Sequence, residues 1–372
     1  MLIPRSGPEV FVTGGGPAGL AAAIAARRRG FSVILADSAE PPIDKACGEG
    51  LMPSTQAALH QLGIELPSDV GFRFRGIQFV HDGTSVSADF PACDGMGIRR
   101  TLLHELLLRQ AEKSGVKMLW RATVTGISAG SVHLKNHVVS PRWIIGADGS
   151  HSRVRPWTRL DSISTTSRRF ATRRHYRVRP WSQFMEIHWG PRLQAYVTPI
   201  SGSEVCVVIM AHNSHDANFD YAMQTLPVLR ARLVDAELSG SQRGALTMIQ
   251  SLPRVWRGNV ALVGDASGGV DAITGEGLRL AFQQAIALAR VMESGDLREY
   301  GAVHRRLARR SVRIARLMLQ LGNCPRLRSR VIAALNRNPR LFARLLAIHV
   351  GQPPPLQFLG TGARLTWELF AS

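Results

Sequence analysis

The chain has 372 residues, 45% of them hydrophobic and 20% charged, so it carries enough apolar material for a folded core, which excludes a disordered chain. Its 46 Lys and Arg against 27 Asp and Glu give a net charge of +19, and its four cysteines are too widely spaced for a zinc site or a disulfide scaffold. We therefore expect no metal. The N-terminus shows no signal-peptide pattern and no apolar run reaches the ~18 residues of a membrane span, which predicts a cytoplasmic protein.

The first predicted elements are a strand at residues 9–12, a glycine-rich turn and an alanine-rich helix at residues 20–26. In the turn, Gly14 permits the tight bend, Gly16 lets the backbone approach a pyrophosphate, and Gly19 allows close packing of the helix on the strand. The N-terminus of the helix would face the phosphates. The loop residues that we assign to a cofactor site are Gly14, Gly16, Ala18 and Gly19.

A second predicted strand, at residues 31–37, ends at Asp37 and completes a βαβ unit. A carboxylate at this position can accept hydrogen bonds from the hydroxyls of an adenosine ribose. It would also repel a 2′-phosphate. The unit therefore predicts a site for FAD or NAD that disfavours NADP.

The remaining elements are predicted in this order: a helix at 100–115, strands within 116–139, a buried strand at 143–145, antiparallel strands within 170–211, a strand at 259–265, a helix at 278–291 and further helices to about 348. Because nucleotide-type segments return after the antiparallel strands, we expect the second domain to be inserted in the first. The predicted divisions are a cofactor-binding domain (1–70, 95–160 and 250–300), a substrate domain (71–94 and 161–249) and a C-terminal helical region (301–372).

Two later segments resemble known flavin-binding sequences. Residues 144–155 read I-I-G-A-D-G-S-H-S-R-V-R and resemble the G-A-D-G-x-x-S-x-V-R segment of FAD-dependent aromatic hydroxylases, with Asp148 at its aspartate. Residues 259–266 read N-V-A-L-V-G-D-A and resemble the second FAD fingerprint of those enzymes. In that fingerprint the aspartate of a Gly-Asp pair binds the ribityl chain. The pair here is Gly264 and Asp265.

Three fingerprints in this order make the chain similar to the flavoprotein superfamily built around para-hydroxybenzoate hydroxylase, which includes group A monooxygenases and geranylgeranyl reductases. The resemblance implies FAD as the cofactor and NAD(P)H as a transient electron donor. It also implies an α/β fold in which a Rossmann-type FAD-binding domain carries an inserted antiparallel β-sheet substrate domain and C-terminal helices.

Finer resemblance concerns three segments. Residues 44–51 (D-K-A-C-G-E-G-L) look like the Cys-Gly-Glu-Gly region of geranylgeranyl reductases and related oxidoreductases. Residues 268–278 resemble their G-x-x-x-P-x-T-G-E-G-I loop, which leads into a helix whose N-terminus faces the flavin. Arg100 matches an arginine that binds flavin in the family, and Arg99 could substitute for it. The resemblance adds Arg100, Gly275 and Gly277 to the cofactor site.

Three residues are candidates for catalysis: Cys47, Glu49 and Glu276. Cys47 is either a thiol that faces the substrate or a small buried hydrophobic residue. The two glutamates either tune proton transfer or cap helices.

The leading functional hypothesis is an NAD(P)H-dependent FAD monooxygenase that hydroxylates a hydrophobic phenolic or polyketide-like molecule. The alternative is a geranylgeranyl reductase-like flavoenzyme that reduces isoprenoid double bonds, although the aromatic-rich Y-x-W-x-F-P-K strand of those reductases is replaced by residues 194–200. A second alternative is a non-catalytic flavoprotein or a basic nucleic-acid-binding module. Nucleic acid is the less favoured partner, and a small hydrophobic substrate the more favoured one.

Basic residues accumulate toward the C-terminus, where residues 298–344 hold thirteen arginines and a single acid. A stripe of Ile314, Leu317, Met318 and Leu321 is predicted to pack on the core and to leave the arginines in water. The alternative is that this region, together with residues 341–346, rests on anionic lipid. The enzyme would then be peripheral to the inner membrane face.

Overall fold

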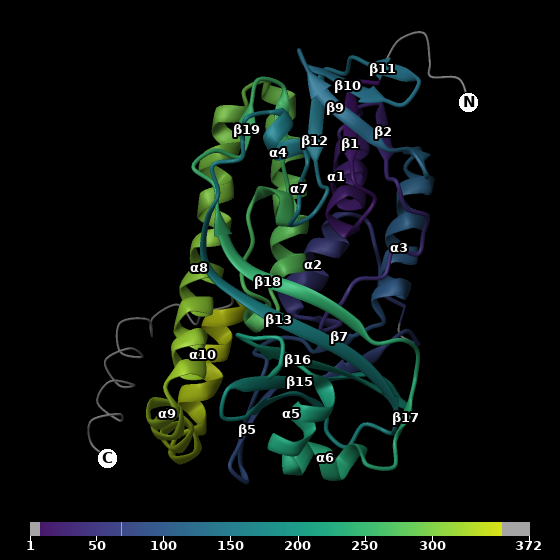
Figure 1. Cartoon of the computed structure of the whole chain (residues 1–372). Helices are drawn as coiled ribbons and strands as arrows, with labels where there is room; N and C mark the ends of the chain where they lie inside the picture. Colours follow the sequence, from purple (N-terminus) through teal and green to yellow (C-terminus); the bar gives the residue numbers. More distant parts are fainter. Residues whose placement is uncertain (1–7, 68, 352–372) are drawn as a thin grey trace.

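The computed structural model describes residues 8–67 and 69–351, and a six-stranded sheet forms the centre of one half of it (Figure 1). All neighbouring strands run parallel except β19 and β20, the pair at one edge of the sheet. In sheet order the strands are β19 (Trp256–Arg257), β20 (Val260–Leu262), β12 (Trp143–Gly146), β1 (Val10–Thr13), β2 (Val33–Ala36) and β8 (Lys117–Leu119). The expected βαβ unit is confirmed.

Helix α1 (Pro17–Arg28) connects β1 to β2 and packs against α7 (Gly277–Ser294) and α3 (Arg100–Lys113). Ala21, Ala22, Ala23, Ala25 and Ala26 are buried, and their small size permits the close packing of helices. Gly19 is required for this arrangement, because a Cβ atom there would lie 1.8 Å from the carbonyl oxygen of Gly14. The short helix α2 (Pro53–Gln61) also lies against α7.

The second half is built on an eight-stranded, mostly antiparallel sheet in which β13 and β18 run side by side across the molecule (Figure 1). Its strands are β17 (Glu237–Leu238), β13 (Ser164–Arg177), β16 (Glu204–Ala211), β15 (Leu193–Ser201), β14 (Phe184–Trp189), β5 (Gly76–His81), β6 (Thr84–Asp89) and β18 (Arg243–Ser251). The inserted antiparallel sheet is therefore confirmed. The exact domain boundaries stay a prediction.

Smaller elements complete the fold. Two three-stranded sheets consist of β3 (Gly50–Leu51), β7 (Gly95–Gly97) and β4 (Phe72–Phe74), and of β9 (Val124–Ser128), β10 (Ser131–Leu134) and β11 (His137–Val139). The short helices are α4 (Val154–Trp157), α5 (Phe219–Thr225), α6 (Pro227–Leu233) and the 3-10 turns η1 (Gly264–Ser267) and η2 (Ala272–Thr274).

The C-terminal helices are α8 (Leu297–Asn323), α9 (Pro325–Arg337) and α10 (Pro339–Val350). Helix α8 runs along one side of the molecule, from the parallel sheet to the antiparallel sheet (Figure 1). Among the described helices, none is long and apolar enough to cross a membrane. Residues 352–372 of the predicted helical region lie outside the described residues.

The predicted apolar stripe on α8 is wrong in part. The helix buries Ser311, Ala315 and Leu319, whereas Leu317 is 61% exposed. The reason is the position of α8, which packs against α7 and η2, so that Ser311 faces α7 and accepts a hydrogen bond from Arg279. Residues Leu341 and Phe342, which we considered as lipid contacts, are also buried in the core.

Candidate active site and cofactor cavity

A cavity of about 890 Å³ lies between the carboxyl ends of the parallel strands and one face of the antiparallel sheet. This is the place where open α/β sheets bind their ligands. Most of the residues predicted from the sequence line it: Gly14, Gly16, Ala18, Asp37, Cys47, Glu49, Arg100, Asp148, Gly264, Asp265, Gly275 and Gly277. Gly19 lies beneath the loop, and Glu276 is not part of the lining.

The glycine loop presents backbone to this cavity. Gly14 has a φ of 104°, and a Cβ atom there would lie 2.5 Å from the carbonyl oxygen of Ala147, so no other residue fits. A Cβ atom on Gly16 would meet nothing within 4 Å. The N-terminus of α1 therefore faces open space, as a site for a pyrophosphate requires.

Asp37 holds this loop from the side. Its carboxylate accepts hydrogen bonds from the backbone N–H groups of Gly15, at 2.6 Å, and Ala39, at 2.7 Å. On the other side His104 donates from Nε2 to the carbonyl oxygen of Gly15 at 2.9 Å. Burial lowers the pKa of His104, so the ring acts as a neutral donor.

Two buried polar atoms at the cavity have no hydrogen-bond partner among the described residues: Arg100 Nε and Asp148 Oδ1. The other oxygen of Asp148 accepts from the backbone N–H groups of Arg153 and Val154 at the start of α4. An unpaired buried polar atom costs about 1–3 kcal/mol, so a polar ligand at both atoms would relieve a real penalty. Together with the open glycine loop, they fit a dinucleotide such as FAD.

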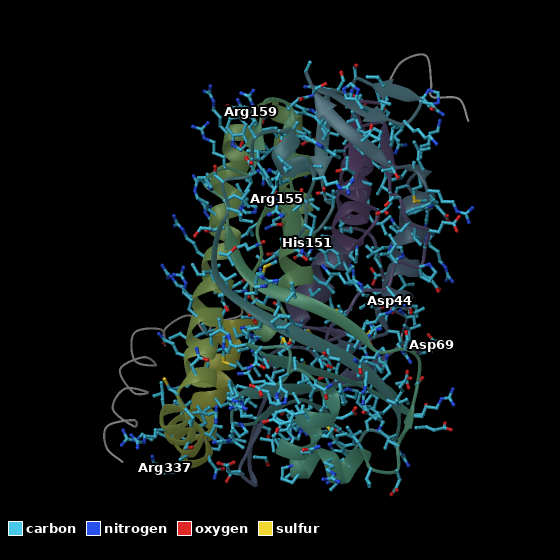
Figure 2. The ribbon with its side chains drawn as sticks, viewed as in Figure 1. Asp44, Asp69, His151, Arg155, Arg159 and Arg337 are labelled. Carbon is cyan, nitrogen blue, oxygen red and sulfur yellow. The ribbon has the colours of Figure 1, made fainter. Side chains whose placement is uncertain are left out.

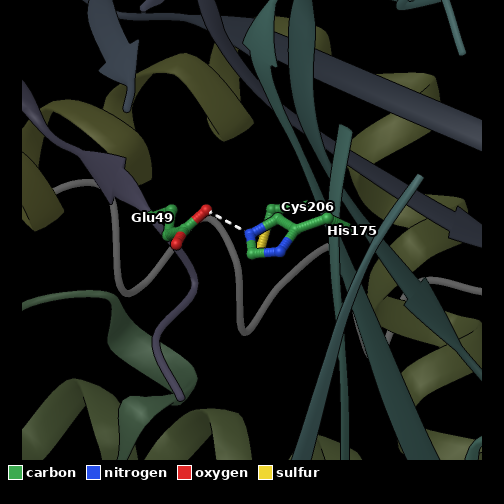
Figure 3. Close-up of side chains that lie close together, drawn as sticks. All are labelled: Glu49, His175 and Cys206. Carbon is green, nitrogen blue, oxygen red and sulfur yellow. Dashed lines mark hydrogen bonds and ion pairs between the residues drawn. The ribbon is translucent and has the colours of Figure 1, made fainter. Parts of the chain in front are cut away.

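Arg99 does not line the cavity, so it does not stand in for Arg100. Its guanidinium pairs with Glu204 and donates from Nη1 to Nδ1 of His175 at 2.8 Å. Because a guanidinium can only donate, Nδ1 must accept and the ring proton of His175 lies on Nε2. That proton points at Glu49 Oε2, 2.7 Å away (Figure 3).

Glu49 is the centre of this buried cluster. It is 3% exposed and its φ is +57°, a conformation that is uncommon outside glycine. Besides His175, its carboxylate accepts from Arg173 Nη1, at 3.2 Å, and from the backbone N–H of Arg100, at 3.0 Å. Glu49 therefore caps α3, as one of the alternatives from the sequence expects, and also ties the cavity wall to β13.

Cys47 lies in the cavity wall beside this cluster and is half-buried, so it is not a core residue. Its Sγ accepts a hydrogen bond from the backbone N–H of Glu49 at 3.4 Å. The neighbouring Cys206 donates its thiol to the carbonyl oxygen of Cys47 at 3.6 Å, and burial raises the pKa of that thiol well above its usual range. Cys206 thus stays protonated and supports the backbone at Cys47.

Among the described residues, Glu49, His175 and Cys206 place three potential metal-ligating atoms within 4.8 Å of one another. Arg173 contacts Glu49 and Arg99 contacts His175. Two positively charged guanidinium groups at the same cluster would repel a divalent cation. The arrangement therefore favours a structural hydrogen-bonded cluster over a metal site.

Glu276 lies behind the cavity wall and is 2% exposed. Its Oε1 accepts from Arg279 Nε at 2.8 Å and from Arg310 of α8 at 3.3 Å. Burial opposes ionisation, but the guanidinium charges of Arg279 and Arg310 and a hydrogen bond from Ser311 favour the carboxylate, and the pKa of Glu276 is lowered. Its position indicates that it anchors the loop from Ala272 to Gly277 and does not contact a substrate.

Two networks that hold the cofactor loops escape sequence reasoning. Arg169 of β13 pairs with Asp271, through Nε at 3.1 Å, in the segment that precedes Gly275. His304 of α8 bonds to Gln284, whose Oε1 accepts from the backbone N–H of Gly264 at 2.8 Å. For the Arg169–Asp271 pair, the sequence offers one indication. Side chains alternate along β13, so Arg169, Arg173 and His175 share one face with the buried Ala171.

The far end of the cavity has a different chemistry. There the antiparallel sheet and its connecting loops contribute mostly apolar side chains to the lining: Ala171, Val208, Met210, Ala245, Leu246, Met248 and Val270. One continuous cavity thus joins a polar end, which suits a dinucleotide, to an apolar end.

A glycine-rich βαβ unit that opens into such a cavity defines a dinucleotide-binding protein. The model of the family described as "FAD binding domain" matches residues 8–294, and the chain belongs to this family. It is therefore an FAD-dependent oxidoreductase.

Curated relatives include the menaquinone reductase of Mycolicibacterium smegmatis, 28% identical over 86% of this chain and 85% of the relative. The digeranylgeranylglycerophospholipid reductase of Methanococcus vannielii is 24% identical over 73% of each chain. Among solved structures, 2-methyl-3-hydroxypyridine-5-carboxylic acid oxygenase superposes with a TM-score of 0.75 at 21% identity, over 93% of this chain and 96% of that one. This last similarity shows the fold alone.

Proposed function

We propose that the protein is a reductase that adds two hydrogen atoms across a double bond in the isoprenoid chain of a lipid. The observation that carries the proposal is the continuous cavity, in which the proposed cofactor end opens onto a wall of apolar side chains. The menaquinone and digeranylgeranylglycerophospholipid reductases among its relatives support it, because both named substrates carry isoprenoid chains.

In this proposal the glycine loop, Asp37, Arg100, Asp148 and Asp265 hold FAD, which supplies hydride when bound and reduced by NAD(P)H. One carbon of the double bond accepts the hydride and the other accepts a proton. Overall, the alkene, NAD(P)H and one proton give the saturated product and NAD(P)⁺.

The thiol of Cys47 is the proposed proton donor to that second carbon. It lies in the cavity wall, where its Sγ accepts a hydrogen bond from the backbone N–H of Glu49. Solvent then returns the proton. Glu49 itself, held by three donors, positions this loop.

Hydroxylation is the second candidate. The segment around Asp148 resembles that of aromatic hydroxylases, and the fold is that of the pyridine carboxylate oxygenase named above. An apolar cavity would also protect an oxygen-transferring flavin from water.

One experiment separates the two. The holoprotein is incubated without oxygen with NAD(P)H and with a menaquinone or a geranylgeranyl lipid, and the products are analysed by mass spectrometry. Reduction predicts a product heavier than the substrate by two hydrogens, with one NAD(P)H consumed for each molecule formed. No anaerobic product, but substrate-stimulated oxygen uptake and incorporation of labelled oxygen from a panel of lipophilic phenols, would refute the reductase and support the hydroxylase.

A lipid of this class resides in a bilayer. The proposal therefore includes a peripheral position of the enzyme at a membrane surface, with the substrate as its principal partner.

A further inference from the structure

The C-terminal helices have an unusual distribution of charge. Residues 300–350 contain twelve of the arginines of the chain and not one Asp or Glu, although the whole chain holds 27 acids. A solvated helical face normally mixes both signs of charge. A face of one sign attracts a surface of the opposite sign.

Some of these arginines have structural roles. Arg310 pairs with the buried Glu276, and Arg328, 3% exposed, donates to the carbonyl oxygens of Leu321 and Gly322. The outward arginines differ. Among the described residues, no acid forms an ion pair with Arg309, Arg313 or Arg316, and all three are exposed.

The exposed arginines of α8 share one side of the helix. Arg306, Arg309, Arg313 and Arg316 follow the i, i+3, i+4 spacing, and exposed Leu317 lies on the same face. Figure 2 shows side chains with nitrogen ends along this outer edge, down to Arg337 at the far end of the C-terminal helices.

Two exposed leucines flank the turn between α8 and α9, one on the last two turns of α8 and one in the first turn of α9. Leu317 is 61% exposed near the end of α8, and Leu327 is 37% exposed at the start of α9. Exposed Arg326 lies beside Leu327. Apolar tips between basic residues are typical of helices that lie in the interface of an anionic bilayer.

Other side chains of these helices reach the cavity loop. His349 of α10 donates from Nε2 to the carbonyl oxygen of Thr274 at 3.0 Å, and Arg310 holds Glu276. Burial lowers the pKa of His349, which keeps the ring neutral. A surface that binds the outer side of α8 would therefore lie next to the helices that fix the cavity wall.

We propose that the outer face of α8 and the α8–α9 turn form a docking face for an anionic lipid bilayer. The docking face consists of Arg306, Arg309, Arg313, Arg316, Leu317, Arg326 and Leu327. The arginines attract the headgroups, and the two leucines enter the acyl boundary. The choice of a lipid surface rests on the proposed function, but binding can be measured without turnover.

The test is co-sedimentation of the full-length holoprotein with phosphatidylcholine vesicles that do or do not contain phosphatidylglycerol. Each basic residue near an anionic surface contributes about fivefold to partitioning. We expect the triple variant R309Q/R313Q/R316Q to bind anionic vesicles about a hundredfold more weakly. The double variant L317S/L327S should weaken the binding that persists at high salt.

The matched control is R230Q/R232Q on α6, where exposed Val228 and Val234 also lie near arginines but Asp235 and Glu237 follow them. This variant should bind vesicles like the wild type. Retained FAD and an unchanged circular dichroism spectrum show that each variant is folded.

Equal recovery of the wild type with neutral and anionic vesicles would overturn the docking face, as would unchanged binding of the triple variant. Binding of DNA in place of vesicles would overturn it in favour of a nucleic-acid surface. Vesicle binding without lipid reduction would refute only the proposed function, whereas lipid reduction in detergent without vesicle binding would refute only the docking face.

Discussion

The buried ion pair between Arg169 and Asp271 gives the sharpest stability prediction. Their side chains are 3% and 0% exposed, and two guanidinium nitrogens contact the two carboxylate oxygens at 3.1 and 2.5 Å. Asp271→Asn keeps the shape of the side chain but leaves the guanidinium charge buried and unpaired. Breaking a buried pair in this way costs about 3–5 kcal/mol.

We expect Asp271→Asn to lower the free energy of unfolding by about this amount in equilibrium urea unfolding. The variant should also retain less FAD, because Asp271 lies between Val270 and Ala272, which line the cavity. The matched control is Asp89→Asn, whose carboxylate forms the same two-point contact with Arg75 while both side chains remain half-exposed. That variant should show no measurable change. Arg169→Met in the Asp271→Asn background should recover part of the loss. Similar losses at Asp271 and Asp89 would refute the reasoning from burial.

Asp265→Ala should abolish FAD retention, and Asp37→Ala should weaken it by tenfold or more, since each hydrogen bond to a charged group contributes about 1.5–3 kcal/mol. FAD release, measured by fluorescence, checks both variants. A colourless wild type that cannot be reconstituted with FAD would contradict the assignment. Gly16→Val should lower the affinity for FAD while the apoprotein stays stable. Gly19→Ala should lower the melting temperature, because its Cβ atom would lie 1.8 Å from a backbone oxygen. A Gly16 variant that loses stability and a Gly19 variant that loses only FAD affinity would be incompatible with the loop geometry. Burial lowers the pKa of His304 to about 4, below its unfolded value of 6.5, so stability is complete above pH 6.5 and falls by about 3 kcal/mol as the pH drops toward 4. His304→Gln should flatten this part of the pH–stability profile, and an unchanged slope would exclude the histidine as its source.

Local patterns were sufficient to predict the cofactor side of the molecule. The glycine loop and Asp37 belong to one contiguous βαβ unit, and Asp148 and Asp265 directly follow buried strands. Because parallel strands end at one edge of a sheet, these residues had to meet there. The structure brings them to one cavity, as expected.

Contacts between distant parts of the chain were not predictable in the same way. His175 lies 126 residues from Glu49, and Arg169 lies 102 residues from Asp271. Nothing local indicates that one buried charge will meet another. The prediction of which face of α8 packs on the core was wrong in part for a related reason. A helix rich in both arginine and leucine has two possible inner faces, and only the neighbouring elements select one.

The support given to the cofactor loops by the C-terminal helices has a consequence for how the chain can be divided. The family match ends at residue 294, yet His304, Arg310 and His349, all beyond it, hold the segments that contain Gly264 and Glu276. A chain shortened to the matched residues would lack these supports and would also expose the inner faces of α7 and β6. Any exchange of segments with a relative must therefore transfer the C-terminal helices together with the second half of the nucleotide-binding sequence.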